Sequence, residues 1–224
     1  MKKVLVLGGT GFVGRHVCEK LQRRGWHITV PTRQPAKAAA VLPLPRVTVV
    51  EADVHDTRQL LRLMEGQHAV VNLVAILHGD EAAFERVHVE LPLAIAEACL
   101  ADAACRLVHI SALGASVDGP SMYQRSKARG EEVLRASGLA LTLLRPSVIF
   151  GRGDRFLNLF ARLQRFSPLV PLAGADARLQ PVWVEDVAEA VAACLGDDAR
   201  GRASIGRTIE CAGPEVLELG ELVR

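Results

Sequence analysis

The sequence predicts an α/β fold, a doubly wound parallel sheet covered by helices on both faces, and three observations support this. Short apolar runs typical of buried strands alternate with amphipathic stretches from the first residues onwards. A glycine-rich turn at residues 8–14 separates the first run from the first amphipathic stretch. The chain has 224 residues, 50% hydrophobic and 23% charged, which is enough to build a core. Because crossovers between parallel strands are right-handed, these units assemble into one sheet.

The expected strands are short apolar runs, and the expected helices carry apolar residues three or four positions apart. The stretch 12–24 shows the helical pattern clearly, with Val13, Val17 and Leu21 on one face. The stretch 81–100 repeats the pattern over a greater length. In chain order we expect strands over residues 3–7, 26–30, 47–52, 69–77, 106–110 and 139–144, and helices over 12–24, 56–64, 81–100 and 122–136.

Beyond Pro146 the pattern loosens. Acidic residues in the first turns of the stretch 185–195 suit the dipole of a helix there. We also expect a turn at 151–154, helices over 156–166 and from 217 to 223, and a strand over 208–211. We predict one domain, residues 1–224, made of a core at 1–150 and a small extension at 151–224. Because the chain ends within an expected helix, the extension is expected to be shortened, or the chain to be a fragment.

Charge and cysteine content argue against several classes of protein. The net charge of +2 argues against a dedicated nucleic-acid-binding protein. Five widely spaced cysteines, with no Cys/His cluster, indicate buried thiols in a reducing compartment and predict no metal site. The apolar run at residues 4–7 is too short for a signal peptide, and no stretch is long enough to span a membrane. We expect a cytoplasmic protein, with peripheral association at the inner membrane left open.

The glycine-rich turn has the spacing of a dinucleotide-binding site. Gly8 permits a tight turn after the first strand, Gly11 lets the backbone approach a pyrophosphate, and Gly14 allows close packing of helix and strand. The helix N-terminus then offers N–H groups and a positive dipole end to the phosphates. The alternative is a tight turn in a fold that binds no ligand.

The end of the second strand favours NADP(H) over NAD(H). NAD sites place an acidic residue about 20 positions after the glycines. Here no carboxylate lies between Gly25 and Val50, and Arg33 stands in that place. A guanidinium can pair with a 2′-phosphate, with Lys37 assisting, unless Arg33 is merely a solvated loop residue. Asp53 is expected at the adenine, with a helix cap as its alternative role.

Tyr123 is the only tyrosine of the chain, and Lys127 follows it by four positions in an expected helix. This spacing places both side chains on one helix face. We expect the ammonium to lower the phenol pKa, so that Tyr123 acts as acid or base towards a carbinol or carbonyl. The alternative is an ordinary surface helix with an incidental Tyr and Lys.

With these motifs in order, the chain resembles the short-chain dehydrogenase/reductase superfamily, in its extended or atypical branches. The stretches 109–115, 144–158 and 180–187 are similar to the nucleotide-binding accessory subunits of respiratory NADH:ubiquinone oxidoreductase and their bacterial relatives. Those subunits carry NADPH without known turnover of a substrate in the respiratory complex. The resemblance implies cofactor contacts at Gly8, Thr10, Gly11, Phe12, Val13, Gly14, Asp53, Val54, Leu73, Val74, Ala75, Tyr123, Lys127, Pro146 and Val148, and a substrate side braced by residues 183–186.

The chain departs from the superfamily at two catalytic positions. A catalytic hydroxyl usually follows the fifth strand, but the sequence there reads Ser111-Ala112, with Ala112 in the usual register. Ser111 remains the candidate, and Ser116 is a remote second. His88 stands near the place of a relay asparagine, where we expect a semi-buried or polar-face histidine, with a role in the site as the alternative. Both departures weaken the case for efficient catalysis and leave dinucleotide binding intact.

Three functions stay open from the sequence. The first is an oxidoreductase or epimerase that acts on an unknown small molecule through Tyr123 and Lys127. The second is a non-catalytic NADPH-binding protein with a respiratory-complex or quinone-related partner. The third is a sugar-nucleotide enzyme that has lost its cap, although no cluster of basic residues in the C-terminal third supports it.

Overall fold

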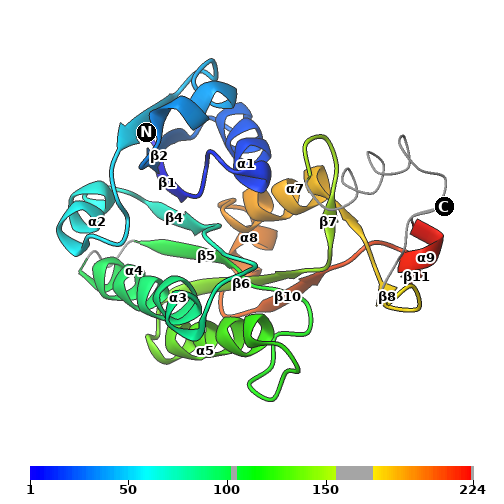
Figure 1. Cartoon of the computed structure of the whole chain (residues 1–224). Coiled ribbons are helices and arrows are strands. Elements are labelled where there is room, and N and C mark those ends of the chain that lie inside the picture. The colour runs from blue at the N-terminus through cyan, green and yellow to red at the C-terminus, as the bar shows by residue number, and fades with distance from the viewer. Residues whose placement is uncertain (102–104, 155–173, 223–224) are drawn as a thin grey trace.

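A computed structural model describes residues 1–101, 105–154 and 174–222 of the chain (Figure 1). Its centre is a seven-stranded sheet in the order β10-β6-β5-β4-β1-β2-β3, and every pairing in it is parallel. This arrangement confirms the predicted doubly wound fold. The strands are β1 (Lys3–Leu7), β2 (His27–Thr32), β3 (Val47–Glu51), β4 (Ala69–Asn72), β5 (Arg106–Ile110), β6 (Ala140–Pro146) and β10 (Thr208–Cys211).

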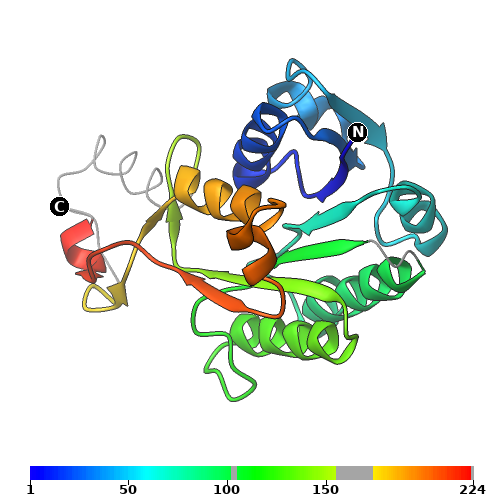
Figure 2. The same cartoon turned by 180° about the vertical axis from the view of Figure 1, so that it is seen from behind.

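One face of the sheet is covered by α1 (Phe12–Arg23) and α7 (Val184–Cys194), which pack against each other. Val4 and Val6 of β1 point to this face, where Val17 of α1 and Val191 of α7 join them in one buried cluster. Seen from behind, α7 and the following α8 (Ala199–Ala203) lie across β10 and β6 (Figure 2). Because β10 pairs with β6, it joins the C-terminal third to the main sheet.

The other face is covered by α2 (Thr57–Met64), α4 (Leu91–Leu100) and α5 (Met122–Ala136). Leu5 and Leu7 alternate with the valines of β1 and point into this second core, beside Leu60 of α2 and Ile95 of α4. Alternation along one strand therefore supplies both cores, as a sheet covered on two faces requires.

The expected helix over 81–100 is interrupted. It consists of α3 (Glu81–Glu85), a π-helical turn η2 (Arg86–Glu90) and α4. At this turn the carbonyl of His88 lies against Gly130 of α5, so closely that a Cβ on Gly130 would overlap it. A glycine on α5 therefore makes room for the bulge.

Other differences concern short elements. The strand expected over 69–77 ends at Asn72, where the Asn72 side chain accepts a hydrogen bond from the N–H of Val74. The helix expected from 217 begins with a two-residue strand, and the helix expected over 156–166 lies outside the described residues. The remaining elements are η1 (Pro35–Ala40), the pairs β7 (Ile149–Phe150) with β9 (Val182–Trp183) and β8 (Arg178–Leu179) with β11 (Leu217–Glu218), and α9 (Leu219–Leu222).

Candidate functional site

The glycine turn between β1 and α1 is packed so tightly that a Cβ at Gly8 or Gly14 would crowd the neighbouring backbone. Gly8 has φ +80°, and a Cβ there would lie 3.2 Å from the carbonyl carbon of Leu73. A Cβ on Gly14 would lie 2.6 Å from the Cα of Gly9 and would overlap the carbonyl oxygen of Gly8. The N–H of Gly11 closes the turn on the Gly8 carbonyl at 3.0 Å. The glycines therefore hold the backbone in one conformation at the carboxyl end of β1.

The N-terminus of α1 is suited to an anion. Gly11 is the N-cap, no side chain caps the helix there, and its first turn carries no acidic residue. Arg15 lies one turn into the helix, with its guanidinium carbon 5.8 Å from the centre of the Phe12 ring, and donates a hydrogen bond to the carbonyl of Arg152. Exposed backbone donors, the helix dipole and a nearby cation are the features that bind a pyrophosphate. The turn therefore fits the group that the glycine spacing predicts.

The segment after β4 adjoins this turn. Leu73 donates its N–H to the carbonyl of Leu7 at 3.0 Å and packs against Gly8, while Val74 is partly buried and Ala75 is exposed. The structure thus brings three of the predicted adenosine and ribose contacts to the edge where the glycine turn lies.

Arg33 and Lys37 follow β2 and are exposed. After β3, the Asp53 carboxylate accepts the N–H of His55 at 3.0 Å. The alternative role of Asp53 as a helix cap is wrong, because Asp56 caps α2 by accepting the N–H of Arg58 at 2.9 Å. Val54 beside Asp53 is partly buried.

Lys127 is buried, with 2% of its surface exposed. Its ammonium donates a hydrogen bond to the carbonyl of Ile110, at the end of β5, over 2.9 Å. Burial lowers the Lys127 pKa to about 8, although Glu131, one helical turn further on, opposes this shift. The lysine is therefore an interior cation, not part of an ordinary surface helix.

Tyr123 is partly buried on the first turn of α5. Burial raises the pKa of its phenol above the usual value of 10.0. The expectation that Lys127 lowers this pKa is wrong, because desolvation favours the neutral phenol. Its ring lies against those of His88 and Phe84, with centroid distances of 5.6 and 6.5 Å.

The hydroxyl candidates after β5 lie in different surroundings. Ser111 is 3% exposed, and its hydroxyl makes no close hydrogen bond within the described part of the chain. It lies near enough to the Glu131 carboxylate to help lower the pKa of that group. Ala112 is buried as well, whereas Ser116 is exposed and accepts the N–H of Asp118 at 3.3 Å.

A buried charge network that the sequence did not single out surrounds Lys127. Glu131 has no exposed side-chain surface and accepts two hydrogen bonds from Arg145 of β6, at 2.8 and 2.7 Å, and one from Arg135 at 2.7 Å. Burial opposes ionisation of Glu131, but Arg145, Ser111 and Arg135 together outweigh it and lower the carboxyl pKa. The signal in the sequence was the i, i+4 spacing of Lys127, Glu131 and Arg135.

Two further predicted contacts lie where β6 continues towards β7. Pro146 accepts the N–H of Leu113 at 2.8 Å, and Val148 accepts the N–H of Val182 at 2.9 Å. Trp183 is 49% exposed. Asp186 is also exposed.

Glu185 turns towards α1 rather than towards a substrate side. Its carboxylate binds the ring of His16 and, at 3.0 Å, the ammonium of Lys20. His16, Glu19 and Glu185 form one possible metal-ligating set among the described residues. Because Lys20 already neutralises Glu185, we interpret the set as an ion-pair contact between α1 and α7.

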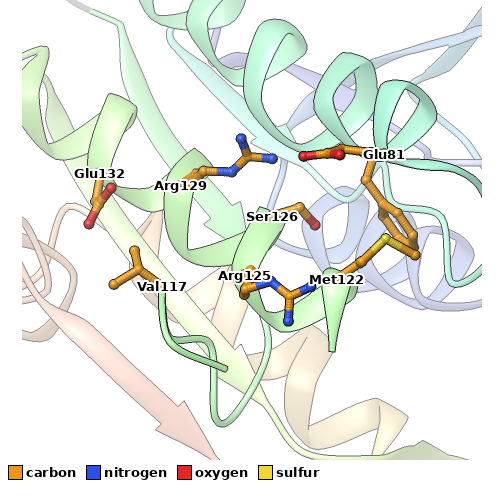
Figure 3. Close-up of a pocket in the computed structure, with 8 residues that line it drawn as sticks. Glu81, Val117, Met122, Arg125, Ser126, Arg129 and Glu132 are labelled. Carbon is orange, nitrogen blue, oxygen red and sulfur yellow. The ribbon is translucent and has the colours of Figure 1, made fainter. Parts of the chain in front are cut away.

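A surface pocket of about 410 Å³ is lined by residues of α3 and α5 and by Val117. Figure 3 shows Arg125, Ser126 and Arg129 along one side of α5, with Glu81 facing them from α3. Its lining includes none of the residues predicted to bind the dinucleotide.

A parallel sheet in this order, with a glycine turn at the first helix, is the fold of NAD-dependent epimerases and dehydratases. The chain belongs to the NAD(P)H-binding family, whose model matches residues 8–198.

Among its relatives, "NADH dehydrogenase [ubiquinone] 1 alpha subcomplex subunit 9, mitochondrial" of Mus musculus is 35% identical over 226 residues, which cover 98% of this chain and 59% of that protein. "Ceramide reductase" of Caulobacter vibrioides is 34% identical over 190 residues, covering 83% of this chain and 58% of that protein. The chain thus spans less than two thirds of these relatives.

Solved structures share the fold at low sequence identity. UDP-glucuronic acid 4-epimerase from Bacillus cereus, in complex with UDP-glucuronic acid and NAD, has a TM-score of 0.83 at 20% identity, covering 97% of this chain and 79% of that one. Within the described ranges, none of the helices combines the length and the apolar character needed to cross a membrane.

Proposed function

We propose that the protein is an NADP(H)-dependent oxidoreductase that reduces a carbonyl group. The observation that carries this proposal is the glycine turn, where a side chain on Gly14 would overlap the backbone that we propose binds the pyrophosphate. In this proposal Gly8, Gly11 and Gly14 admit the phosphates. The other proposed contacts are Thr10, Phe12 and Val13 at the pyrophosphate, Asp53, Val54, Leu73, Val74 and Ala75 at the adenosine, and Pro146 and Val148 at the nicotinamide.

The preference for NADP(H) rests on Arg33. It follows β2 directly and is exposed, and Lys37 lies four residues further along the chain, in η1. An exposed guanidinium can bind a 2′-phosphate through two parallel hydrogen bonds. Residues 25 to 50 contain no carboxylate that could bind the ribose hydroxyls as the acidic residue of an NAD site does.

In the proposed chemistry Tyr123 donates the proton that a carbonyl oxygen takes up. A bound NADPH supplies the hydride. Because burial raises the phenol pKa, Tyr123 holds its proton at neutral pH, which suits reduction. The Lys127 ammonium donates one N–H to the carbonyl of Ile110, so two N–H groups remain for the ribose hydroxyls. A relative named ceramide reductase supports a reduction and points to an apolar carbonyl compound as the substrate class.

Tyr123→Phe tests this chemistry, because it removes only the phenol oxygen. We expect turnover of NADPH with a panel of apolar ketones and quinones to fall about 100-fold or more, the usual contribution of a positioned proton donor. The affinity for NADPH and the Tm should stay unchanged. Ser116→Ala, which removes an exposed hydroxyl, is the matched control and should keep full activity. Unchanged turnover in Tyr123→Phe would exclude Tyr123 as the proton donor.

A second candidate is a non-catalytic NADPH-binding protein that associates with a respiratory complex at the inner membrane. Ala112, which places no hydroxyl in the usual catalytic register, favours it, as does the 35% identity to the mitochondrial subunit over 98% of the chain. It predicts NADPH that resists dialysis and is oxidised by no member of the carbonyl and quinone panel. Turnover with any member would reject this candidate.

A further inference from the structure

We propose that His88 is the positioning residue for Tyr123: it ties the first turns of α5 to the segment that follows β4. Three hydrogen bonds in one chain carry this proposal. The N–H of Ile76 donates a hydrogen bond to Nε2 of His88 at 3.2 Å. Nδ1 of His88 is hydrogen-bonded to the Ser126 hydroxyl at 2.8 Å, and this hydroxyl donates to the carbonyl oxygen of Tyr123 at 2.9 Å. The role given to Tyr123 rests on the proposed function, whereas its placement by His88 does not.

The donors and acceptors of this chain can be assigned in only one direction. A backbone N–H can only donate, so Nε2 of His88 accepts from Ile76. The proton of the neutral ring is then on Nδ1, which donates to the Ser126 hydroxyl. Ser126 in turn donates to the Tyr123 carbonyl, which can only accept. His88 is therefore held as the Nδ1–H tautomer, with both ring nitrogens used.

Burial makes this tautomer persistent. His88 is 1% exposed, and burial together with the nearby Lys127 lowers its pKa to about 3. The expectation of a semi-buried or polar-face histidine is thus wrong, because the ring is enclosed between α5 and the segment after β4. A charged ring would have to break the bond from Ile76, since both nitrogens would then be donors.

The backbone at His88 contacts α5 as well. His88 lies within the π-helical turn, and its carbonyl touches α5 at Gly130, where any Cβ would overlap it. The ring lies edge-on to that of Tyr123, with an interplanar angle of 80°. The side chain and the backbone of one residue therefore fix α5 at two points, about two helical turns apart along it.

The consequence is a mechanical link between the two parts of the site. Ile76 directly follows Leu73 to Ala75, the proposed adenosine contacts, and Tyr123 is the proposed proton donor. An optimally placed donor can lose about 100-fold in rate through a displacement of 1 Å. His88 thus sets the position of Tyr123 relative to the cofactor segment without touching the reacting atoms.

The lone tyrosine permits a test without any substrate. Protein labelled with carbon-13 at the tyrosine Cζ gives one resonance, which reports the surroundings and the ionisation of Tyr123. We expect His88→Leu and Ser126→Ala to move this resonance at pH 7 and to shift its titration midpoint down, towards the ordinary value near ~10, as the phenol becomes hydrated. His109→Leu is the matched control, because His109 is equally buried but bonds Asn72 instead.

The outcomes separate clearly. Unchanged resonance and midpoint in Ser126→Ala would overturn the proposal even if His88→Leu fails to fold. An equal shift in His109→Leu would also overturn it, since any buried histidine would then have the same effect. In the wild type, nitrogen-15 spectra must show the His88 ring neutral with the proton on Nδ1. Loss of turnover in Tyr123→Phe concerns the proposed function alone and has no bearing on the spectra of the His88 and Ser126 variants, which retain Tyr123.

Discussion

Gly14→Ala is the sharpest test of the proposed dinucleotide site, because two opposite effects are expected of it. Gly14 lies within α1, where an alanine normally stabilises a helix by about 1 kcal/mol. Here the added Cβ would lie 2.6 Å from the Cα of Gly9 and would overlap the Gly8 carbonyl oxygen. Both are backbone atoms, so the turn must move by roughly 1 Å to restore an ordinary contact near 3.6 Å.

A shift of this size misaligns the backbone donors at the start of α1. Hydrogen bonds to a charged group contribute roughly 1.5–3 kcal/mol each, so losing two weakens binding by about 3–6 kcal/mol. The Kd for NADPH should therefore rise about 100-fold to 10,000-fold, at 1.4 kcal/mol for each factor of ten. Isothermal titration calorimetry measures the Kd, and thermal unfolding without cofactor should give a lower Tm than the wild type.

Gly138→Ala is the control for this variant. Gly138, unlike Gly14, has φ in the left-handed region, at +70°, and a Cβ there meets nothing within 4 Å. It should cost roughly 1 kcal/mol of stability through backbone strain and leave the Kd unchanged. The reasoning fails if Gly14→Ala binds NADPH as the wild type does, or if its Tm rises as helix propensity alone predicts.

The remaining predictions concern cofactor choice, pH and the missing hydroxyl. Arg33→Ala should weaken NADPH about 10-fold to 100-fold and leave NADH unchanged in fluorescence titrations, whereas equal wild-type affinities would refute the role of Arg33. His88 and His109 have pKa values lowered by burial, so the unfolded chain binds more protons below pH 6.5 and stability falls on acidification. Urea unfolding at pH 7 and 5 should show this loss, and His88→Asn should reduce it by about 2 kcal/mol. Ala112→Ser should raise kcat about tenfold or more, and an unchanged kcat would show that this hydroxyl does not limit turnover.

The sheet was predictable because its strands are apolar and end at clear signals. The strands at Lys3–Leu7 and Arg106–Ile110 and the helix at Met122–Ala136 have the predicted bounds. Ser121 and Gln124 form a capping box that fixes the start of α5. By contrast, apolar character does not stop at Asn72, so the predicted β4 was too long. The paired strands β7 and β9 have two residues each and leave no periodic signal.

The placement of Tyr123 and Lys127 on one helix was predictable from the sequence, whereas the electrostatics around them were not. The spacing of Tyr123 and Lys127 indicates a shared helix face, but the direction of a pKa shift depends on burial by distant elements. Desolvation decides the direction for Tyr123, and the combined contacts of Arg145, Ser111 and Arg135 decide it for Glu131. His88 was misjudged for the same reason, since its partners Ile76 and Ser126 lie 12 and 38 positions away.

The two proposed activities depend on two parts of the molecule that meet at α5, because Tyr123 and Lys127 are also proposed cofactor contacts. Dinucleotide binding rests on the turn between β1 and α1, whose shape is fixed by backbone contacts among glycines. Proton donation rests on α5, where Glu131, held by Arg145, keeps a countercharge beside Lys127. A countercharge of this kind helps a buried lysine remain a cation, so the α5 side retains the electrostatics that catalysis needs. Ala112→Ser would add a hydroxyl near α5 and would leave the glycine turn between β1 and α1 unchanged. Under the proposed function, tight binding of NADPH is compatible with a low rate of turnover, so affinity alone does not separate an enzyme from an accessory subunit.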